Sequence, residues 1–204
     1  MDAYTFIEHL NDAAQESAII NPSASGVVCN ILLQSWQVKE NQRIVNNFVF
    51  GQMGAGLSAS IGAHYATGKP VIMVEGDGGF QLNIQELQTV KRLELPIIIF
   101  VINNDGYASI RMSQQKAFGR LTGADSSSGL TLPRLSAIAR AYEIPYLLID
   151  DATIFNIKYV VKLEKLCLCE VMIDHNQQFR DRVQSHLENG VMVNDGLESI
   201  YEKD

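Results

Sequence analysis

The amino-acid sequence predicts an α/β domain of three layers, doubly wound around a mostly parallel sheet of about six strands. Two apolar, largely β-branched runs, residues 71–74 and 96–102, are typical of strands buried on both faces of a parallel sheet. Each run ends in a polar, glycine-containing cluster, and strand-like segments alternate with helix-like segments along the chain. Such alternation implies right-handed crossovers between parallel strands.

The individual elements follow from local patterns taken in chain order. Apolar residues recur at helical spacing from residue 4 to residue 14, and comparable patterns repeat between the apolar runs. The expected helices cover residues 4–14, 27–36, 54–66, 84–90, 132–142 and 154–163, and the expected strands cover residues 18–20, 43–45, 71–74, 96–102, 145–149 and 167–173. We assign residues 1–174 to the domain.

Two segments are expected to lack regular structure. Residues 119–129 are rich in glycine and serine, so they offer little to bury, and we expect a mobile loop that orders over a ligand. Residues 175–204 are polar, and we expect an irregular tail of the same domain that wraps over its surface.

Composition excludes several functional classes. A content of 47% apolar and 19% charged residues is ordinary for a folded core, and the net charge of −7 argues against nucleic-acid binding. No apolar run approaches the roughly 20 residues of a membrane helix, and no signal peptide is visible, so we expect a cytoplasmic protein. Cys29, Cys167 and Cys169 lack CxxC spacing and are expected to be reduced and buried.

The two strand-end clusters carry the chemistry of the chain. Gly76-Asp77-Gly78 follows the first apolar run, and Asn103-Asn104-Asp105-Gly106 follows the second. Because ligands bind at the carboxyl ends of strands in open α/β sheets, both clusters should meet in one crevice. A carboxylate, an amide oxygen and free backbone amides suit Mg²⁺ that holds a diphosphate. An N-cap of the next helix is the alternative for Asp77, and a simple turn is the alternative for the second cluster when it is taken alone.

These clusters, at this spacing, resemble the diphosphate-binding signature of thiamine-diphosphate enzymes. Gly51-Gln52-Met53-Gly54 and Ile61-Gly62-Ala63 resemble the preceding segment of acetolactate synthases, and residues 85–89 resemble their following helix. Asn104-Asp105-Gly106-Tyr107 resembles the pyruvate decarboxylase form of the second cluster. The resemblance runs from about residue 4 to residue 200.

The resemblance implies roles for individual residues. Asp77, Asn104 and the carbonyl of Gly106 would be Mg²⁺ ligands. The other residues implied to bind thiamine diphosphate are Gly51, Gln52, Met53, Gly76, Gly78, Gly79 and Tyr107. Gly51 would accept a hydrogen bond from the cofactor's amino group, and Met53 would wedge under the cofactor to keep it bent, although ordinary core packing also explains a methionine there.

One loop departs from the family pattern. Acetolactate synthases usually have Gly-x-His-Gln after the first strand, whereas residues 21–28 of this chain contain neither histidine nor glutamine. We expect Ser23, Ser25 and the Gly26 amide to contact the diphosphate instead. Gly79 also stands where many relatives carry serine.

The function implied is that of the C-terminal thiamine-diphosphate- and Mg²⁺-binding domain of an acetolactate synthase-like enzyme, which decarboxylates a small 2-oxo acid and transfers the acyl carbanion. The essential glutamate of such enzymes lies on a pyrimidine-binding domain of the same or a neighbouring subunit. We therefore place no catalytic residue in this chain and expect it to be inactive alone. The resemblance also implies that the parent enzyme is a homodimer or tetramer. The parent could bind FAD as well, but on another domain.

Two alternatives remain open at this point. The chain could be the small subunit of a split sulfopyruvate- or phosphonopyruvate-type decarboxylase. It could also be a non-catalytic module that retains the fold, although the intact set of Asp77, Asn104 and Gly106 counts against this.

Overall fold

The computed structural model describes residues 1–16, 18–23, 26–46, 49–180, 183 and 185–196. The strands are β1 (Ile19–Pro22), β2 (Arg43–Ile44), β3 (Val71–Gly76), β4 (Ile97–Asn103), β5 (Tyr146–Ile149), β6 (Cys167–Met172), β7 (Ser185–Glu188) and β8 (Val191–Asn194). The α-helices are α1 (Ala3–Ala13), α2 (Val27–Ser35), α3 (Ala55–Thr67), α4 (Asp77–Phe80), α5 (Glu86–Arg92), α6 (Ala108–Phe118), α7 (Leu135–Ala141) and α8 (Asn156–Leu163), with 3₁₀ turns at Gln81–Asn83 and Ser126–Ser128.

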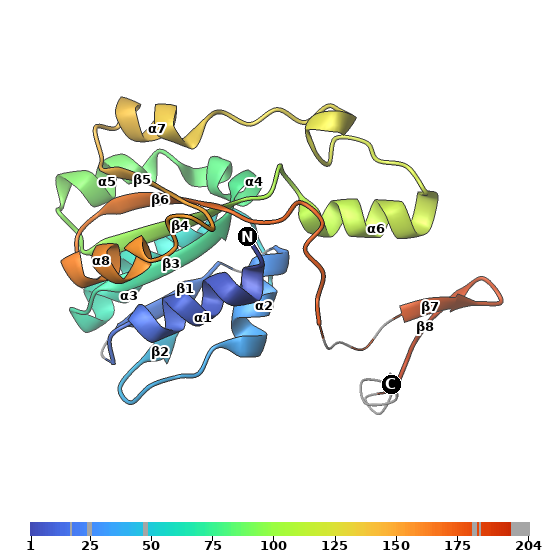
Figure 1. Ribbon diagram of the computed structural model, residues 1–204, viewed down its shortest axis with the longest axis horizontal. Helices are drawn as coiled ribbons and strands as arrows, with labels where there is room; N and C mark the ends of the chain where they lie inside the picture. Colours follow the sequence, from blue (N-terminus) through green and yellow to red (C-terminus); the bar gives the residue numbers. More distant parts are fainter. Residues whose placement is uncertain (17, 24–25, 47–48, 181–182, 184, 197–204) are drawn as a thin grey trace.

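Six strands form one parallel sheet in the order β2-β1-β3-β4-β6-β5, which confirms the predicted fold class. Helices cover both faces of this sheet (Figure 1). From β1 the chain proceeds to one edge, whereas from β3 it proceeds toward the other. The carboxyl ends of β1 and β3 therefore flank a point where the winding reverses, the usual ligand site of such sheets.

The three layers enclose two apolar clusters, one on each face of the sheet. Residues of α1, α2 and α8 pack on one face with alternate strand residues such as Val74 and Phe100. Residues of α3, α5 and α7 pack on the other face with Met73 and Val101. The central strand β4 is buried along Ile97–Ile102 because both faces are covered, as its continuous apolar run predicts.

Strand β1 is longer than the sequence suggested. Asn21 and Pro22, expected to lie in a turn, continue the strand opposite Met73 and Val74 of β3. The amide of Ser23 then donates to the carbonyl of Val74. Proline is tolerated here because its nitrogen faces the β2 side, where the pairing with β1 has ended at Ile20, so no ladder hydrogen bond is lost.

Helix α6 is absent from the predicted elements. Of its residues, only Ala108 and Arg111 are buried, so it lacks the apolar stripe by which helices are recognised in a sequence. The expected irregular tail also contains regular structure: β7 and β8 pair as an antiparallel hairpin that extends away from the main sheet (Figure 1).

The segment before that hairpin packs on the domain. The amide of Ala3 donates to Oε1 of Gln177, and the guanidinium of Arg180 stacks over the ring of Tyr4. Residues 177–180 therefore lie against the start of α1, whereas wrapping of the rest of the tail stays a prediction. Among the described helices, none is long and apolar enough to cross a membrane.

Candidate functional site

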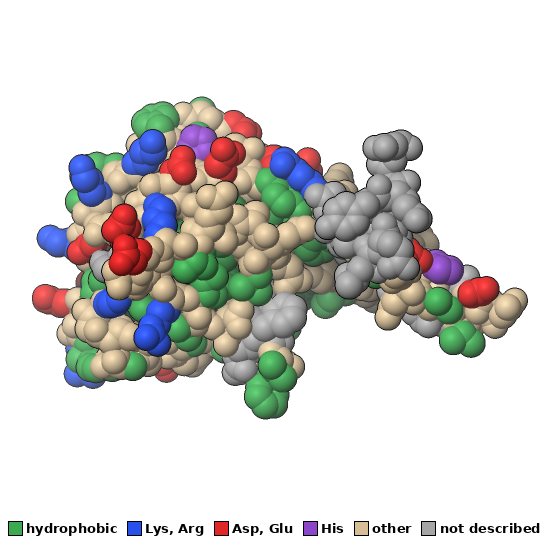
Figure 2. Space-filling view, turned by 90° about the horizontal axis from the view of Figure 1, so that it is seen from below, with side chains coloured by type: hydrophobic (Ala, Val, Ile, Leu, Met, Phe, Trp, Pro, Cys, Tyr) green, Lys and Arg blue, Asp and Glu red, His purple; other side chains and the backbone are tan. Residues whose placement is uncertain are grey.

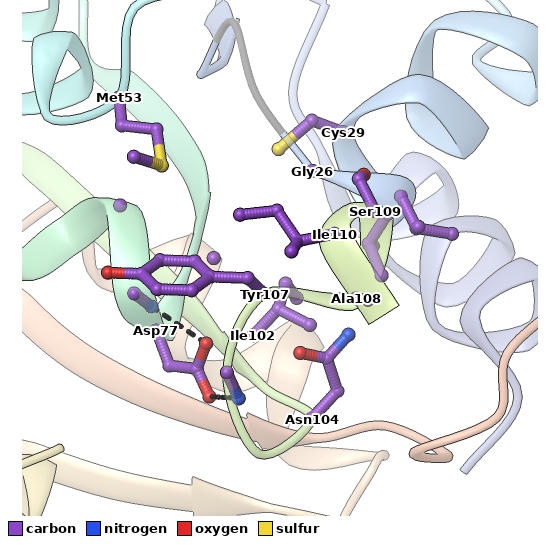
Figure 3. A pocket seen from close by; sticks show the side chains of 16 residues that line it. Gly26, Cys29, Met53, Asp77, Ile102, Asn104, Tyr107, Ala108, Ser109 and Ile110 are labelled. Carbon is purple, nitrogen blue, oxygen red and sulfur yellow. Dashed lines mark hydrogen bonds between the residues drawn. The ribbon is translucent and has the colours of Figure 1, made fainter. Parts of the chain in front are cut away.

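A cavity of about 100 Å³ opens at the carboxyl ends of β1, β3 and β4 (Figure 3). It lies at the reversal of winding between β1 and β3. The sequence-predicted residues that line it are Gly26, Met53, Gly76, Asp77, Gly78, Gly79, Asn104, Gly106 and Tyr107. Both strand-end clusters therefore meet in one crevice, together with the segment that carries Met53.

Asp77 joins the two clusters directly. Its Oδ1 accepts a hydrogen bond of 2.7 Å from the Gly78 amide, and its Oδ2 accepts one of 2.9 Å from the Gly106 amide. The backbone amide of Asn104 also acts on this carboxyl, and two carboxylate oxygens with two lone pairs each can still take a further partner. The residue is only 4% exposed, and burial raises the pKa of its carboxyl to about 6 although the amides of Gly106 and Gly78 lower it.

The raised pKa of Asp77 predicts a pH-dependent stability of the chain without added cations. Between its ordinary pKa of 3.8 and about 6, the folded chain retains a proton that the unfolded chain releases. Stability should therefore fall as the pH rises through this window, by up to about 3 kcal/mol, and then stay level with respect to this group. Urea unfolding at pH 4 to 8 measures it. The variant Asp77→Ala should lose this component, and identical slopes in both proteins would contradict the assignment.

The side chain of Arg111, in α6, holds the backbone of the turn that follows β4. Its guanidinium donates to the carbonyls of Asn104 and Asp105 at 2.8 and 2.9 Å and also to the carbonyl of His175. It lies 3.9 Å from the carboxylate of Asp125, whose pKa is lowered by the hydroxyls of Ser128 and Ser127. Sequence analysis missed Arg111, because no motif links it to the turn whose backbone it holds.

The loop of residues 119–129 is anchored more firmly than its composition suggested. Ala124 and Asp125 are buried, whereas the glycines and serines of the loop are exposed or half-buried, as their small side chains suggested. The carbonyl of Ala124 accepts from the Tyr107 amide at 2.8 Å, and Asp125 caps the 3₁₀ turn that follows. The expected ordering of this loop over a ligand stays a prediction.

Gly106 stands where the turn and this loop touch. It has a φ of 104°, and a Cβ on it would lie 2.7 Å from the carbonyl oxygen of Ala124 and 2.5 Å from a methyl group of Leu130. Gly106→Ala should therefore lower the free energy of unfolding by about 3 kcal/mol, through both strain and crowding. Gly129→Ala is a matched control: its φ is 100° but nothing lies within 4 Å. Its cost should be about 1 kcal/mol, from strain alone. Equal losses in urea unfolding would contradict the crowding at Gly106.

The aromatic ring of Tyr107 and the thioether of Met53 line the cavity. The Tyr107 ring packs on Gly78, where a Cβ would lie 2.2 Å from a ring carbon, so only glycine fits beneath the ring. Met53 and Cys29 lie farther up the cavity (Figure 3). The side-chain amide of Asn104 lies on the same side as the Asp77 carboxylate (Figure 3). The Asp77 carboxylate and the Asn104 amide thus lie at the opposite end of the cavity from the sulfur atoms of Met53 and Cys29 (Figure 3).

Several predicted residues lie elsewhere. Gly51 and Gln52 are exposed and do not line the cavity, although they adjoin Met53. Ser23 is buried outside the cavity, and its hydroxyl donates to Oε1 of Glu75 at 2.9 Å. Ser25 lies outside the described residues.

Sequence analysis did not single out Glu75, because a charged residue that follows an apolar run is ordinarily interpreted as the exposed end of a strand. It is 1% exposed, and burial raises the pKa of its carboxyl against the opposing hydrogen bonds from Ser23 and the Gly54 amide. The burial of a carboxylate beside a predicted site is the signal that could have found it.

A second cavity, of about 320 Å³, opens on the other side of Asp77. Asn103, the first residue of the second cluster, lines it and donates to Glu170 of β6 at 2.6 Å. Asn103, the last residue of β4, and Asn104, the first residue after it, thus line different cavities. Asp77 lines both cavities, and it is Asn104 that joins it in the first.

Comparison with known proteins agrees with this geometry. Residues 24–167 match the family described as "Thiamine pyrophosphate enzyme, C-terminal TPP binding domain". Thiamine pyrophosphate (TPP) is another name for thiamine diphosphate. The chain is 33% identical, over 64% of its length, to the acetolactate synthase large subunit of Buchnera aphidicola subsp. Schlechtendalia chinensis. It is 29% identical, over 78% of its length, to that of Porphyra purpurea. It spans 23% and 28% of those relatives.

Solved structures show the same fold. The thiamine diphosphate-dependent 4-hydroxybenzoylformate decarboxylase of Rhodococcus jostii RHA1 superposes with a TM-score of 0.74 at 19% identity. The superposition covers 87% of this chain and 33% of that one.

Proposed function

Because the chain belongs to the thiamine pyrophosphate enzymes through their C-terminal cofactor-binding domain, we propose that it binds Mg²⁺ and the diphosphate end of thiamine diphosphate at Asp77. One observation carries the proposal: a buried carboxylate joins the two strand-end clusters through the Gly106 amide, inside a cavity. A buried carboxylate calls for a cation, and its free lone pairs point to a metal ion.

The donor set fits the proposed ligands. Asp77, Asn104 and the Gly106 carbonyl are oxygen donors of the kind that Mg²⁺ prefers. The Gly106 carbonyl already accepts from the Ala108 amide at 3.1 Å, and a carbonyl oxygen can accept a second partner. Gly76, Gly78 and Gly79 leave the cavity floor without side chains, so the backbone is open to phosphate oxygens wherever the Tyr107 ring does not cover it.

We propose that the parent enzyme is acetolactate synthase-like, on the basis of the large-subunit relatives. When bound, thiamine diphosphate supplies the electron sink for decarboxylation of a 2-oxo acid. The residues of this chain hold the metal and diphosphate end, and Met53 supports the apolar end. The split decarboxylase stays an alternative, since the chain covers only about a quarter of its large-subunit relatives.

A partner domain is part of the proposal. Val49 and Phe50, separated from Met53 by Gly51 and Gln52, are 91% and 80% exposed, so apolar surface lies close to the segment that lines the cavity. Such surface is typical of an interface, and we propose that a pyrimidine-binding domain of the same or a neighbouring subunit covers it, in a homodimer or tetramer. Any FAD of the parent would bind elsewhere.

The setting proposed is the cytoplasm, without nucleic acid. The described cysteines are free and buried, as is usual in a reducing compartment. Acidic and basic side chains intermingle on the face shown in Figure 2, whereas nucleic-acid binders gather basic ones. The absence of nucleic-acid binding remains a prediction.

Calorimetric titration of the full chain with thiamine diphosphate tests the proposed function. We expect saturable binding in the presence of Mg²⁺ and none when the metal is chelated, because the diphosphate charge then faces Asp77 uncompensated. Thiamine without its diphosphate is the control ligand and should not bind. Binding that is indifferent to Mg²⁺, or equal for thiamine, would contradict the proposal.

A further inference from the structure

Glu75 occupies a position in β3 that the fold assigns to an apolar side chain. Side chains of a strand alternate between its faces, so Glu75 shares a face with Val71 and Met73, which belong to the apolar cluster beneath α3. Glu75 is nevertheless a carboxylate and is buried. A buried charge is retained only where hydrogen bonds compensate for the lost water.

Its contacts reach two other segments. Oε1 accepts from the Ser23 hydroxyl at 2.9 Å and from the Gly54 amide at 3.0 Å. Its Oε2 faces Gly56, where a Cβ would lie only 2.4 Å away. The first turn of α3 therefore approaches the carboxylate as closely as a helix can, and a glycine makes this approach sterically feasible.

These contacts fix the backbone that follows Met53. Gly54 is the N-cap of α3, with a φ of 81°, and the capping position has no side-chain hydrogen bond of its own. Beyond it, Nδ2 of Asn21 donates to the carbonyl of Gly56 and to the hydroxyl of Ser60. Polar side chains at the ends of β1 and β3 thus anchor the start of α3, and it is Glu75 that accepts from the amide of Gly54, the residue that follows Met53.

We propose that Glu75 is a positioning residue that places Met53 in the cavity by holding the Gly54 amide. This inference rests on the proposed function, since Met53 matters only if a cofactor lies against it. It extends that function to a residue that never touches the ligand. The role requires a side chain with an oxygen acceptor of this length, and the contacts above do not depend on how the acceptor is charged.

Two ligands distinguish a loss of the position of Met53 from damage to the whole site. Thiamine diphosphate would contact both Asp77 and Met53, whereas inorganic diphosphate would contact only the Asp77 end. Both are titrated with Mg²⁺ into the full chain and into Glu75→Leu, which fills the apolar position but removes the acceptor. We expect affinity for thiamine diphosphate to fall about tenfold, and affinity for inorganic diphosphate to stay within about twofold.

Three further variants complete the experiment. Glu75→Gln retains an oxygen acceptor at the same length and should restore thiamine-diphosphate affinity to within about threefold of the original chain. Val71→Ala weakens the same apolar cluster without touching Gly54, and should leave the ratio of the two affinities unchanged. Met53→Ala should mimic Glu75→Leu, and combining the two should add little, because both act on one contact.

The outcomes are distinguishable. An original chain that binds neither ligand would refute the proposed function and this inference with it. If the original chain binds both, then equal losses of both ligands in Glu75→Leu, unchanged affinities, or failure of Glu75→Gln to restore binding would overturn the positioning role alone.

Discussion

Asp77→Ala is expected to weaken Mg²⁺-dependent binding of thiamine diphosphate by at least about 100-fold, since loss of even an outer-shell partner of a metal costs 10- to 100-fold. The substitution removes a proposed metal ligand and also the acceptor of the Gly106 amide, so the second cluster loses its link to the first. Titration calorimetry with and without Mg²⁺ measures the effect.

Asp150→Ala is the matched control for this substitution. Asp150 also follows a strand, β5, and its carboxylate accepts from the amides of Ala152 and Thr153, but it does not line the cavity. We expect it to lose some stability and no ligand affinity. Far-ultraviolet circular dichroism should show both variants folded. Unchanged affinity in folded Asp77→Ala would refute the metal assignment.

The chain alone is expected to release no carbon dioxide from pyruvate, even with thiamine diphosphate and Mg²⁺. It supplies the metal and diphosphate end of the proposed site, with Asp77, Asn104 and Gly106, and the apolar contact of Met53. It has no group assigned to protonate the pyrimidine ring, and the apolar side chains of Val49 and Phe50, shortly before Met53, are exposed. Without the proposed partner domain the reactive geometry is poorly held and water is not excluded.

Carbon dioxide release is compared with a cofactor-only reaction, and binding of the cofactor is confirmed in the same sample. An Asp77→Ala sample provides the protein background. Steady turnover above both backgrounds, lost in Asp77→Ala, would show that the site is complete and that no partner domain is needed.

Much of the sheet and of the cavity floor was predictable from the sequence. The runs Val71–Val74 and Ile97–Ile102 are apolar on both faces, which few structures other than a covered parallel strand require. Once these strands are neighbours, their ends must converge, and Asp77 does meet Gly106. This part of the site follows from local patterns because each cluster is continuous in sequence.

The remainder depends on contacts between distant segments. Ser23 offers a hydroxyl, but which acceptor it meets is decided by the register of β1 on β3. Arg111 acts on backbone carbonyls, which every residue possesses, so no sequence signal marks its partners. Helix α6 is held by Arg111 and by the turn before it rather than by an apolar stripe, so hydrophobic periodicity gives no sign of it.

The position of β6 between β4 and β5 has a consequence for the order of folding. Strand β4 pairs with β3 on one side but meets its second neighbour only when residues 167–172 are available. During synthesis, the most apolar strand of the chain therefore presents an open edge while α6, α7, β5 and α8 are still being made. Open apolar edges pair promiscuously, so this interval is when the nascent chain is most exposed to aggregation. A chain shortened before Cys167 would keep that edge permanently.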